Sequence, residues 1–280
     1  MQITTLTTGL CFGEGPRWHD DQLWLSDMHA HQVLKVSYSG ETTPVIEVEN
    51  RPSGLGWLPN GDLLVVSMTD SRILRFDGEK LVTHADLSSL ASFHCNDMVV
   101  DSNGRAYVGN FGFDLMAGAA PAPAELICVE PDGSARIVAD QLMFPNGIVI
   151  TEDASTLIVA ETFSARLTAF DILDNGDLTN RRIWAELPQG AVPDGICLDS
   201  HGGIWSASPT SHDCIRQIEG GEVTHRIELE QAAYACILGG ADGNTLFVLT
   251  ADSSDPEECK ASRSGRVVSC QVPFNRAGRP

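Results

Sequence analysis

Residues 144–150 read FPNGIVI, and residues 192–198 read VPDGICL. In both stretches a polar residue, Asn146 or Asp194, stands between a proline and a glycine and precedes a short apolar run. Proline fixes φ at about −65°, and glycine accepts bends and close backbone approaches that other residues resist. The pattern therefore predicts a side-chain oxygen held rigidly where a buried strand begins.

The same pattern recurs in weaker form along the whole chain. Aligning the polar or small residue before each apolar run gives six positions: Glu14, Ser53, Asn96, Asn146, Asp194 and Cys236. Their spacings are 39, 43, 50, 48 and 42 residues. A period of about 40–50 residues made of short strands indicates a β-propeller with four strands per blade.

Within each unit the strand signals follow the same order. Asn-Gly, Asp-Gly or acidic turns follow the first run, and they are strong hairpin signals. The sixth unit has no fourth strand after residue 272, whereas residues 2–7 form an orphan strand. We expect this strand to join the last blade, because closing the ring removes an exposed edge. The prediction is one all-β domain, residues 1–280, folded as a six-bladed β-propeller.

Signals for other structure are few. Only residues 87–90 and 231–233 tolerate a helix, and both stretches are short. Residues 114–124 and 252–264 lengthen the third and sixth units, and we interpret them as loops, either plain surface loops or substrate lids.

Because the innermost strand of each blade lines the centre of a propeller, the six aligned positions are expected to converge. Glu14 and Asp194 would supply carboxylates, Asn96 and Asn146 amide oxygens, and the other two positions small side chains. Such an oxygen-rich set predicts a site for a hard cation. Calcium fits best by ligand type, while zinc, manganese and magnesium remain open.

Charge and composition narrow the function classes. The formal net charge is −20, which repels phosphate backbones and argues against a nucleic-acid partner. There is no apolar run long enough to span a membrane and no export signal at the N-terminus, so we expect a cytoplasmic protein. The eight cysteines show no C-x-x-C pair, and we expect reduced, mostly buried thiols.

Other catalytic patterns are missing or are better explained as turns. The sequence has no G-x-S-x-G and no H-E-x-x-H motif. Residues 211–213 read SHD, but three adjacent residues on a turn cannot reproduce triad geometry. We interpret Asp27, His29 and His31 as turn and surface residues.

Five motifs, taken in order, resemble the senescence marker protein/gluconolactonase family, the regucalcin-like lactonases. They are GEGPRW (13–18), RPSGL (51–55), CND (95–97), FPNG (144–147) and VPDG (192–195). The resemblance implies a six-bladed propeller with one catalytic divalent metal ion. By motif matching it implies that Glu14, Asn146 and Asp194 bind the metal. It also implies that Asn96 contacts substrate or a metal-bound water and that Asp194 is the general base.

Two departures from the family pattern concern the substrate. His94 stands where family members that act on sugar lactones have an arginine, and the carboxylate of the next loop is Asp114 rather than a glutamate. An arginine fork suits several sugar hydroxyls, and a histidine suits fewer. Asn96, His94 and Asp114 are therefore the predicted substrate-binding residues, with a sugar lactone or a less polar lactone as substrate.

The predicted function is hydrolysis of a small lactone to a hydroxy acid by a metal-dependent enzyme. One alternative is a calcium-dependent hydrolase that cleaves a phosphotriester instead of a lactone, because related six-bladed propellers hydrolyse phosphotriesters with calcium. The other alternative is a non-enzymatic metal- or ligand-binding propeller. We expect a monomer or a weak homo-oligomer.

Overall fold

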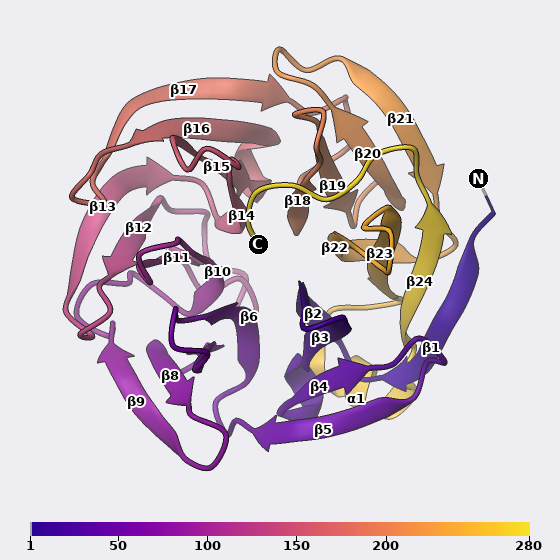
Figure 1. Ribbon diagram of the computed structural model, residues 1–280, viewed down its shortest axis with the longest axis horizontal. Helices are drawn as coiled ribbons and strands as arrows, with labels where there is room; N and C mark the ends of the chain where they lie inside the picture. The colour runs from indigo at the N-terminus through magenta and orange to yellow at the C-terminus, as the bar shows by residue number, and fades with distance from the viewer. Residues whose placement is uncertain (1) are drawn as a thin grey trace.

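The computed structural model describes residues 2–280 and shows six four-stranded antiparallel sheets arranged around a ring (Figure 1). The predicted six-bladed β-propeller is thus confirmed. In five blades the strands lie in chain order from the centre outwards, and consecutive strands pair as hairpins. Figure 1 shows the innermost strands, β2, β6, β10, β14, β18 and β22, grouped around the centre of the ring.

The strand bounds follow the repeat closely. Blade 1 contains β2 (Gly13–His19), β3 (Gln22–Asp27), β4 (Gln32–Val36) and β5 (Thr42–Glu47). Blade 2 contains β6 (Pro52–Trp57), β7 (Leu63–Ser67), β8 (Arg72–Phe76) and β9 (Leu81–Asp86). Blade 3 contains β10 (Cys95–Val100), β11 (Ala106–Asn110), β12 (Ala124–Val129) and β13 (Ala135–Leu142).

The second half of the chain repeats this order. Blade 4 contains β14 (Pro145–Ile150), β15 (Thr156–Glu161), β16 (Arg166–Ile172) and β17 (Leu178–Glu186). Blade 5 contains β18 (Ile196–Leu198), β19 (Ile204–Ser208), β20 (Asp213–Gln217) and β21 (Val223–Glu228). Blade 6 contains β22 (Ala232–Gly239), β23 (Thr245–Ala251), β24 (Gly265–Gln271) and β1 (Thr4–Leu10).

The N-terminal strand closes the ring as expected. β1 pairs antiparallel with β24, with Thr4 opposite Ser269 and Leu10 opposite Gly265. The strand begins two residues later than the sequence suggested and extends to Leu10. The last blade is therefore built from both ends of the described chain.

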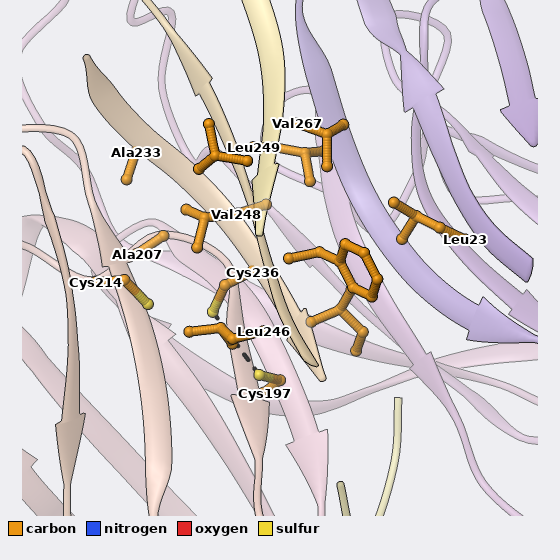
Figure 2. Close-up of a cluster of buried hydrophobic side chains, with 14 of the residues drawn as sticks. Leu23, Cys197, Ala207, Cys214, Ala233, Cys236, Leu246, Val248, Leu249 and Val267 are labelled. Carbon is orange, nitrogen blue, oxygen red and sulfur yellow. Dashed lines mark hydrogen bonds between the residues drawn. The ribbon is translucent and has the colours of Figure 1, made fainter. Parts of the chain in front are cut away.

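The core lies between neighbouring blades. Every residue of β10 and of β14 is buried, whereas the outermost strand β5 is exposed or half-buried throughout. Figure 2 shows one of these clusters, in which Cys197, Cys214 and Cys236 pack among leucine and valine side chains. All eight cysteines are free, buried thiols, in keeping with the small apolar role expected for them.

Two glycines of the repeated motif let the innermost strands approach one another. A Cβ on Gly147 would lie 2.5 Å from the Ile196 nitrogen, and one on Gly195 would lie 2.7 Å from the Ala235 Cα. Both distances are far inside van der Waals contact, and the obstacle is backbone that cannot move aside. The motif glycines therefore bring the strand starts of blades 4, 5 and 6 together.

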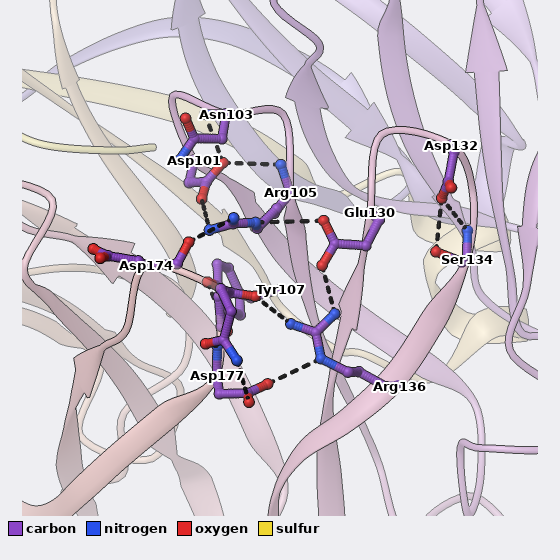
Figure 3. A network of polar contacts seen from close by, with 12 residues as sticks. Asp101, Asn103, Arg105, Tyr107, Glu130, Asp132, Ser134, Arg136, Asp174 and Asp177 are labelled. Atoms are coloured by element: carbon purple, nitrogen blue, oxygen red, sulfur yellow. Dashed lines mark hydrogen bonds and ion pairs between the residues drawn. The ribbon is translucent and has the colours of Figure 1, made fainter.

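Polar side chains also join blades at the outer surface. Figure 3 shows a network between blade 3 and the turn that joins β16 to β17. Arg136 bridges Glu130 and Asp177, with 2.9 Å between its Nε and the Asp177 Oδ1. The buried Tyr107 hydroxyl donates to the Gly176 carbonyl at 3.0 Å. None of the predicted site residues belongs to the network, and we assign it a structural role.

Two local expectations were wrong. Residues 256–262 of the expected sixth-unit loop form the α-helix α1 (Pro256–Ser262). Its N-cap, Asp255, accepts hydrogen bonds from the backbone N–H groups of Glu257 and Glu258, and proline begins the helix. Residues 232–233, expected to tolerate a helix, begin β22, because pairing with β23 outweighs weak local propensity.

The SHD sequence forms a turn, as predicted. Asp213 begins β20, and the Ser211 hydroxyl donates to its carboxylate at 2.6 Å. Among the described residues, no helix combines the length and the apolar character needed to cross a membrane.

Candidate functional site

The aligned side chains lie at one end of the ring, where the innermost strands begin. Four of them are the second residue of an innermost strand: Glu14 in β2, Ser53 in β6, Asn96 in β10 and Asn146 in β14. Asp194 lies two residues before β18, and its carbonyl accepts the Gly147 N–H at 3.2 Å. The Ser53 hydroxyl lies 3.5 Å from Asn96 Oδ1. Residues far apart in the sequence are thus neighbours in the structure.

The sixth position belongs to Tyr234, so the alignment of Cys236 was wrong. The Gly195 N–H donates to the Tyr234 carbonyl at 2.8 Å, just as the corresponding glycine of blade 4 bonds to Asp194. A bulge between Ala233 and Ala235 shifts the register of β22. Cys236 consequently faces the core, where its Sγ lies 3.9 Å from that of Cys197.

Tyr234 brings a phenol ring close to the two carboxylates. Burial raises its pKa to about 12, and the nearby charges of Asp194 and Glu14 add to the rise. Little in the sequence points to Tyr234, because its blade lacks the proline and glycine that mark the motif elsewhere.

The surroundings of both carboxylates disfavour their charged forms. Burial raises the pKa of Glu14 well above its usual value, and the charges of Asp194 and Asp97 raise it further. Burial likewise raises the pKa of Asp194, although the Asn146 amide opposes this. Asp194 is buried and Glu14 is half-buried, and two carboxylates so placed repel each other unless a cation or a proton is shared between them.

Two buried atoms of the site lack partners. Asp194 Oδ1 and Asn96 Nδ2 are both inaccessible to solvent and make no hydrogen bond to any described residue. Such atoms are costly to bury unpaired, so each is a candidate contact for a ligand. Within residues 2–280 no group of three His, Cys, Asp or Glu side chains is placed to hold a metal ion. The predicted metal ligands, Glu14, Asn146 and Asp194, are not such a group, because one of the three is an amide. Two carboxylates and an amide oxygen suit a hard divalent cation.

A buried ion pair beneath the site joins three blades. Arg17 Nη2 lies 2.7 Å from Asp97 Oδ1, and the guanidinium also donates to the carbonyls of Leu55 and Met98. Arg17 follows Glu14 by three residues, and Asp97 follows Asn96 directly. The pair therefore fixes the strands that carry two of the site residues. Both residues lie in the motifs quoted above, but their pairing cannot be read from sequence.

Buried polar residues at the ends of second strands hold the loops that lead into the site. The Asp27 carboxylate accepts the N–H groups of Cys11 at 3.1 Å and Phe12 at 2.9 Å, just before Glu14. In the corresponding places of blades 4 and 5, Glu161 accepts the Met143 N–H at 2.9 Å and Ser208 Oγ accepts the Val192 N–H at 3.2 Å. All three predicted metal ligands are thus preceded by an anchored loop.

Asp27 and His29 are therefore not surface residues, contrary to the sequence interpretation. Both are buried, and only His31 occupies a turn position, with φ at 61°. The His29 ring stacks on Phe12 with centroids 5.2 Å apart, and its Nε2 lies 3.3 Å from the Ser254 carbonyl. Burial lowers the pKa of His29 from 6.5 to about 4.

Acidification should therefore destabilise the protein through His29. The folded state holds this histidine neutral, so its contribution to stability is complete above pH 6.5 and is lost as the pH falls towards about 4. The loss corresponds to at most about 3 kcal/mol. Urea unfolding at pH 7 and pH 5 should show a larger drop for the wild type than for His29→Gln, which cannot titrate. Equal drops would contradict this assignment.

The predicted substrate-binding residues other than Asn96 lie around one loop. His94 is half-buried, and its carbonyl accepts the Phe111 N–H at 2.9 Å. Burial lowers the pKa of His94, Asp114 opposes the shift, and the Arg51 guanidinium adds to it. The Asp114 carboxylate accepts the Ala117 N–H at 3.0 Å and so also shapes its own loop. Arg51 was not anticipated, because it belongs to another blade.

A sizeable cavity lies elsewhere in the ring. It has a volume of about 700 Å³ and is lined by the far ends of the innermost strands, including His19, Trp57 and Ile150, and by residues 276–280. The C-terminal segment crosses this end of the ring (Figure 1), where Arg279 forms a bridge with Ile150. None of the predicted site residues lines it.

The fold and these side chains define a six-bladed propeller with a candidate cation site at one end of its axis. The family described as SMP-30/Gluconolactonase/LRE-like region matches residues 12–252, and the chain belongs to this family. Pentonolactonase XacC from Haloferax volcanii is 27% identical over 300 residues, covering 100% of this chain and 97% of that protein.

Two further comparisons, one of sequence and one of structure, extend over most of this chain and of the relative. Regucalcin from Gallus gallus is 26% identical over 258 residues, covering 88% of this chain and 85% of that protein. A solved structure of a calcium-binding protein, regucalcin, from Agrobacterium tumefaciens superposes with a TM-score of 0.79 at 20% identity. It covers 96% of this chain and 92% of that one.

Proposed function

We propose that the protein is a divalent-metal-dependent lactone hydrolase. Family membership and the likeness to a protein named pentonolactonase support the lactone bond as the target. The observation that carries the proposal is the pair of neighbouring carboxylates, the half-buried Glu14 and the buried Asp194, together with an unpartnered Asp194 oxygen and an unpartnered Asn96 amide at the same end of the ring. These groups together offer a cation site, a base and a hydrogen-bond donor.

Glu14, Asn146 and Asp194 would hold the ion. When bound, a divalent cation supplies Lewis-acid polarisation of the lactone carbonyl. Calcium is our first choice because the donors are oxygens, and the calcium-binding regucalcin structure is in accord with it. Zinc, manganese and magnesium remain alternatives.

The remaining steps fall to side chains of this chain. The free Asp194 oxygen is the proposed general base, accepting a proton from the water that adds to the lactone carbon. The Asn96 amide is the proposed donor to the carbonyl oxygen as negative charge develops there. The ring C–O bond then breaks, and Asp194 returns the proton to the ring oxygen, which gives a hydroxy acid. His94 and Asp114 are proposed to contact the substrate beyond its carbonyl.

A substrate panel tests the proposed bond specificity. Hydrolysis of γ-, δ- and sugar lactones, followed at constant pH in the presence of calcium, should exceed the background rate clearly for at least one lactone. A phosphotriester such as paraoxon is assayed in parallel and should be turned over at least about tenfold less efficiently. Turnover of the phosphotriester alone would favour the alternative hydrolase. Saturable binding of a lactone without turnover would favour a binding protein.

A further inference from the structure

We propose that the lactone carries an apolar substituent, alkyl or aryl, which binds to a wall of aromatic side chains beside the candidate site. This inference rests on the proposed lactonase function and specifies its substrate class. We call this set the aromatic wall, and it comprises Phe12, Phe111, Phe113, Phe144, Phe163 and Tyr234. Three members are buried and form its backing (Phe12, Phe113 and Phe144), whereas the half-buried Phe111 and Tyr234 and the exposed Phe163 are those that can contact a ligand.

One half of the aromatic wall flanks the carboxylates. Phe12 precedes Glu14 by two residues, and its ring meets that of Tyr234 edge to face, with centroids 4.7 Å apart. Phe111 packs against the same apolar cluster, which also contains Met28 and Met68. These side chains come from blades 1, 2, 3 and 6. Four blades therefore contribute apolar groups at the end of the ring where the site lies.

The other half flanks the amides. Phe144 lies two residues before Asn146, and Phe111 stacks on it with ring centroids 4.3 Å apart. Phe163 lies 5.3 Å from Phe144 and 5.1 Å from Phe113 between ring centroids. Phe111 thus takes part in both halves and makes the aromatic wall continuous.

Phe163 is tied directly to the site. It follows Thr162, whose hydroxyl lies 3.3 Å from Asn146 Nδ2 and donates to the Pro193 carbonyl at 2.8 Å. Nevertheless its side chain is 44% exposed, and those of Leu115 and Met116 in the adjoining loop are 37% and 54% exposed. These three exposed apolar side chains gather next to a polar site, where contact with an apolar ligand would cover them.

The neighbouring polar groups are too few for a polyhydroxylated ring. Arg51 and Asp114 are the charged groups that act on His94 at this loop, and the Asp114 carboxylate already accepts a backbone N–H. Each sugar hydroxyl placed against phenylalanine would lose its hydrogen bonds to water without replacement. An alkyl chain or an aromatic ring has no hydrogen bonds to water to lose, and it buries apolar surface against the phenylalanine side chains.

A series of γ-lactones with increasing alkyl-chain length tests whether the substrate carries an apolar substituent. For γ-lactones from γ-valerolactone to γ-decalactone, kcat/KM should rise by about two- to fourfold for each methylene that reaches the aromatic wall. Glucono-δ-lactone should be a poorer substrate than the longer γ-lactones. In Phe163→Ala the rise with chain length should be markedly flatter, and Phe163→Leu should restore most of it. Ile183→Ala removes a similarly exposed apolar side chain from β17, the outermost strand of the same blade, and should leave the series unchanged.

The outcomes separate this inference from the proposed function. A flat series in the wild type, or a preference for glucono-δ-lactone, overturns the apolar substituent while leaving lactone hydrolysis standing. If no lactone is hydrolysed, calorimetric titration with γ-decalactone still decides the question. Binding that weakens in Phe163→Ala then supports the aromatic wall, and no binding overturns it. Melting temperatures of the variants identify any loss of folding.

Discussion

Replacing Asp194 with asparagine is expected to reduce kcat/KM for the best lactone by about 10³-fold or more, without lowering the melting temperature. The variant keeps the shape of the side chain but removes both the proposed base and one negative charge of the cation site. Because Asp194 is buried near Glu14 and Asp97, and burial raises its pKa, losing its charge should leave the metal-free protein as stable as before or more so. Steady-state kinetics and thermal unfolding measure the two effects.

Asp199 supplies a matched control. It too is a buried aspartate, but its oxygens lie 2.6 Å and 3.0 Å from the Arg216 guanidinium, away from the site. Asp199→Asn weakens a buried ion pair and should cost stability, up to about 3–5 kcal/mol, while kcat of the folded protein stays near the wild-type value. If Asp194→Asn instead lowered stability and left kcat/KM intact, Asp194 would be a structural residue and the proposed mechanism would be wrong.

Removal of divalent metal is the second large effect. Dialysis against a chelator should lower lactone hydrolysis at least about 100-fold, and calcium, zinc or manganese should restore it. Metal binding should also stabilise the fold, because it offsets the repulsion between Glu14 and Asp194. At a metal concentration 100 times Kd the gain is about 2.7 kcal/mol, or a rise in Tm of about 5 °C.

The thermal shift gives a readout that does not depend on turnover. Glu14→Gln should abolish the rise in Tm on adding metal, since it removes one of the two anionic donors. Glu257→Gln, on the exposed face of α1, changes the same charge outside the site and should respond like the wild type. Full activity and an unchanged Tm after chelation, with no metal found by elemental analysis, would contradict the metal site.

Much of the fold could be predicted from the sequence, because five of the six blades are each formed by a continuous stretch of chain that carries a form of the same short motif. Proline and glycine around Asn146 and Asp194 mark where an innermost strand begins, and the spacing of such marks defines a blade. The register error at Tyr234 arose where these marks are missing and a bulge inserts an extra residue. Helix α1 was overlooked although Asp255 and Pro256 are good start signals, because seven residues are too few for a periodic pattern.

The site was only partly predictable. Motif spacing indicated which positions meet at the centre of the ring, and the structure places Glu14, Asn96, Asn146 and Asp194 at the same end. The residues that hold the site loops and strands in place could not be predicted. Asp27, Glu161 and Arg17 do so through contacts between strands, which no local sequence pattern encodes. The continuity of the aromatic wall also depends on contacts between separate blades.

The pairing of β1 with β24 has a consequence for how the protein matures. Thr4 and its partner, Ser269, are separated by most of the described chain, so β1 is synthesised well before the strand with which it pairs. Five blades can assemble in order during synthesis. The sixth blade keeps an exposed strand edge until β1, which was synthesised earlier, pairs with β24. Until then the N-terminal strand β1 must be kept from pairing with other strands. The pairing of β1 with β24 closes the ring and is the last long-range contact to form during folding.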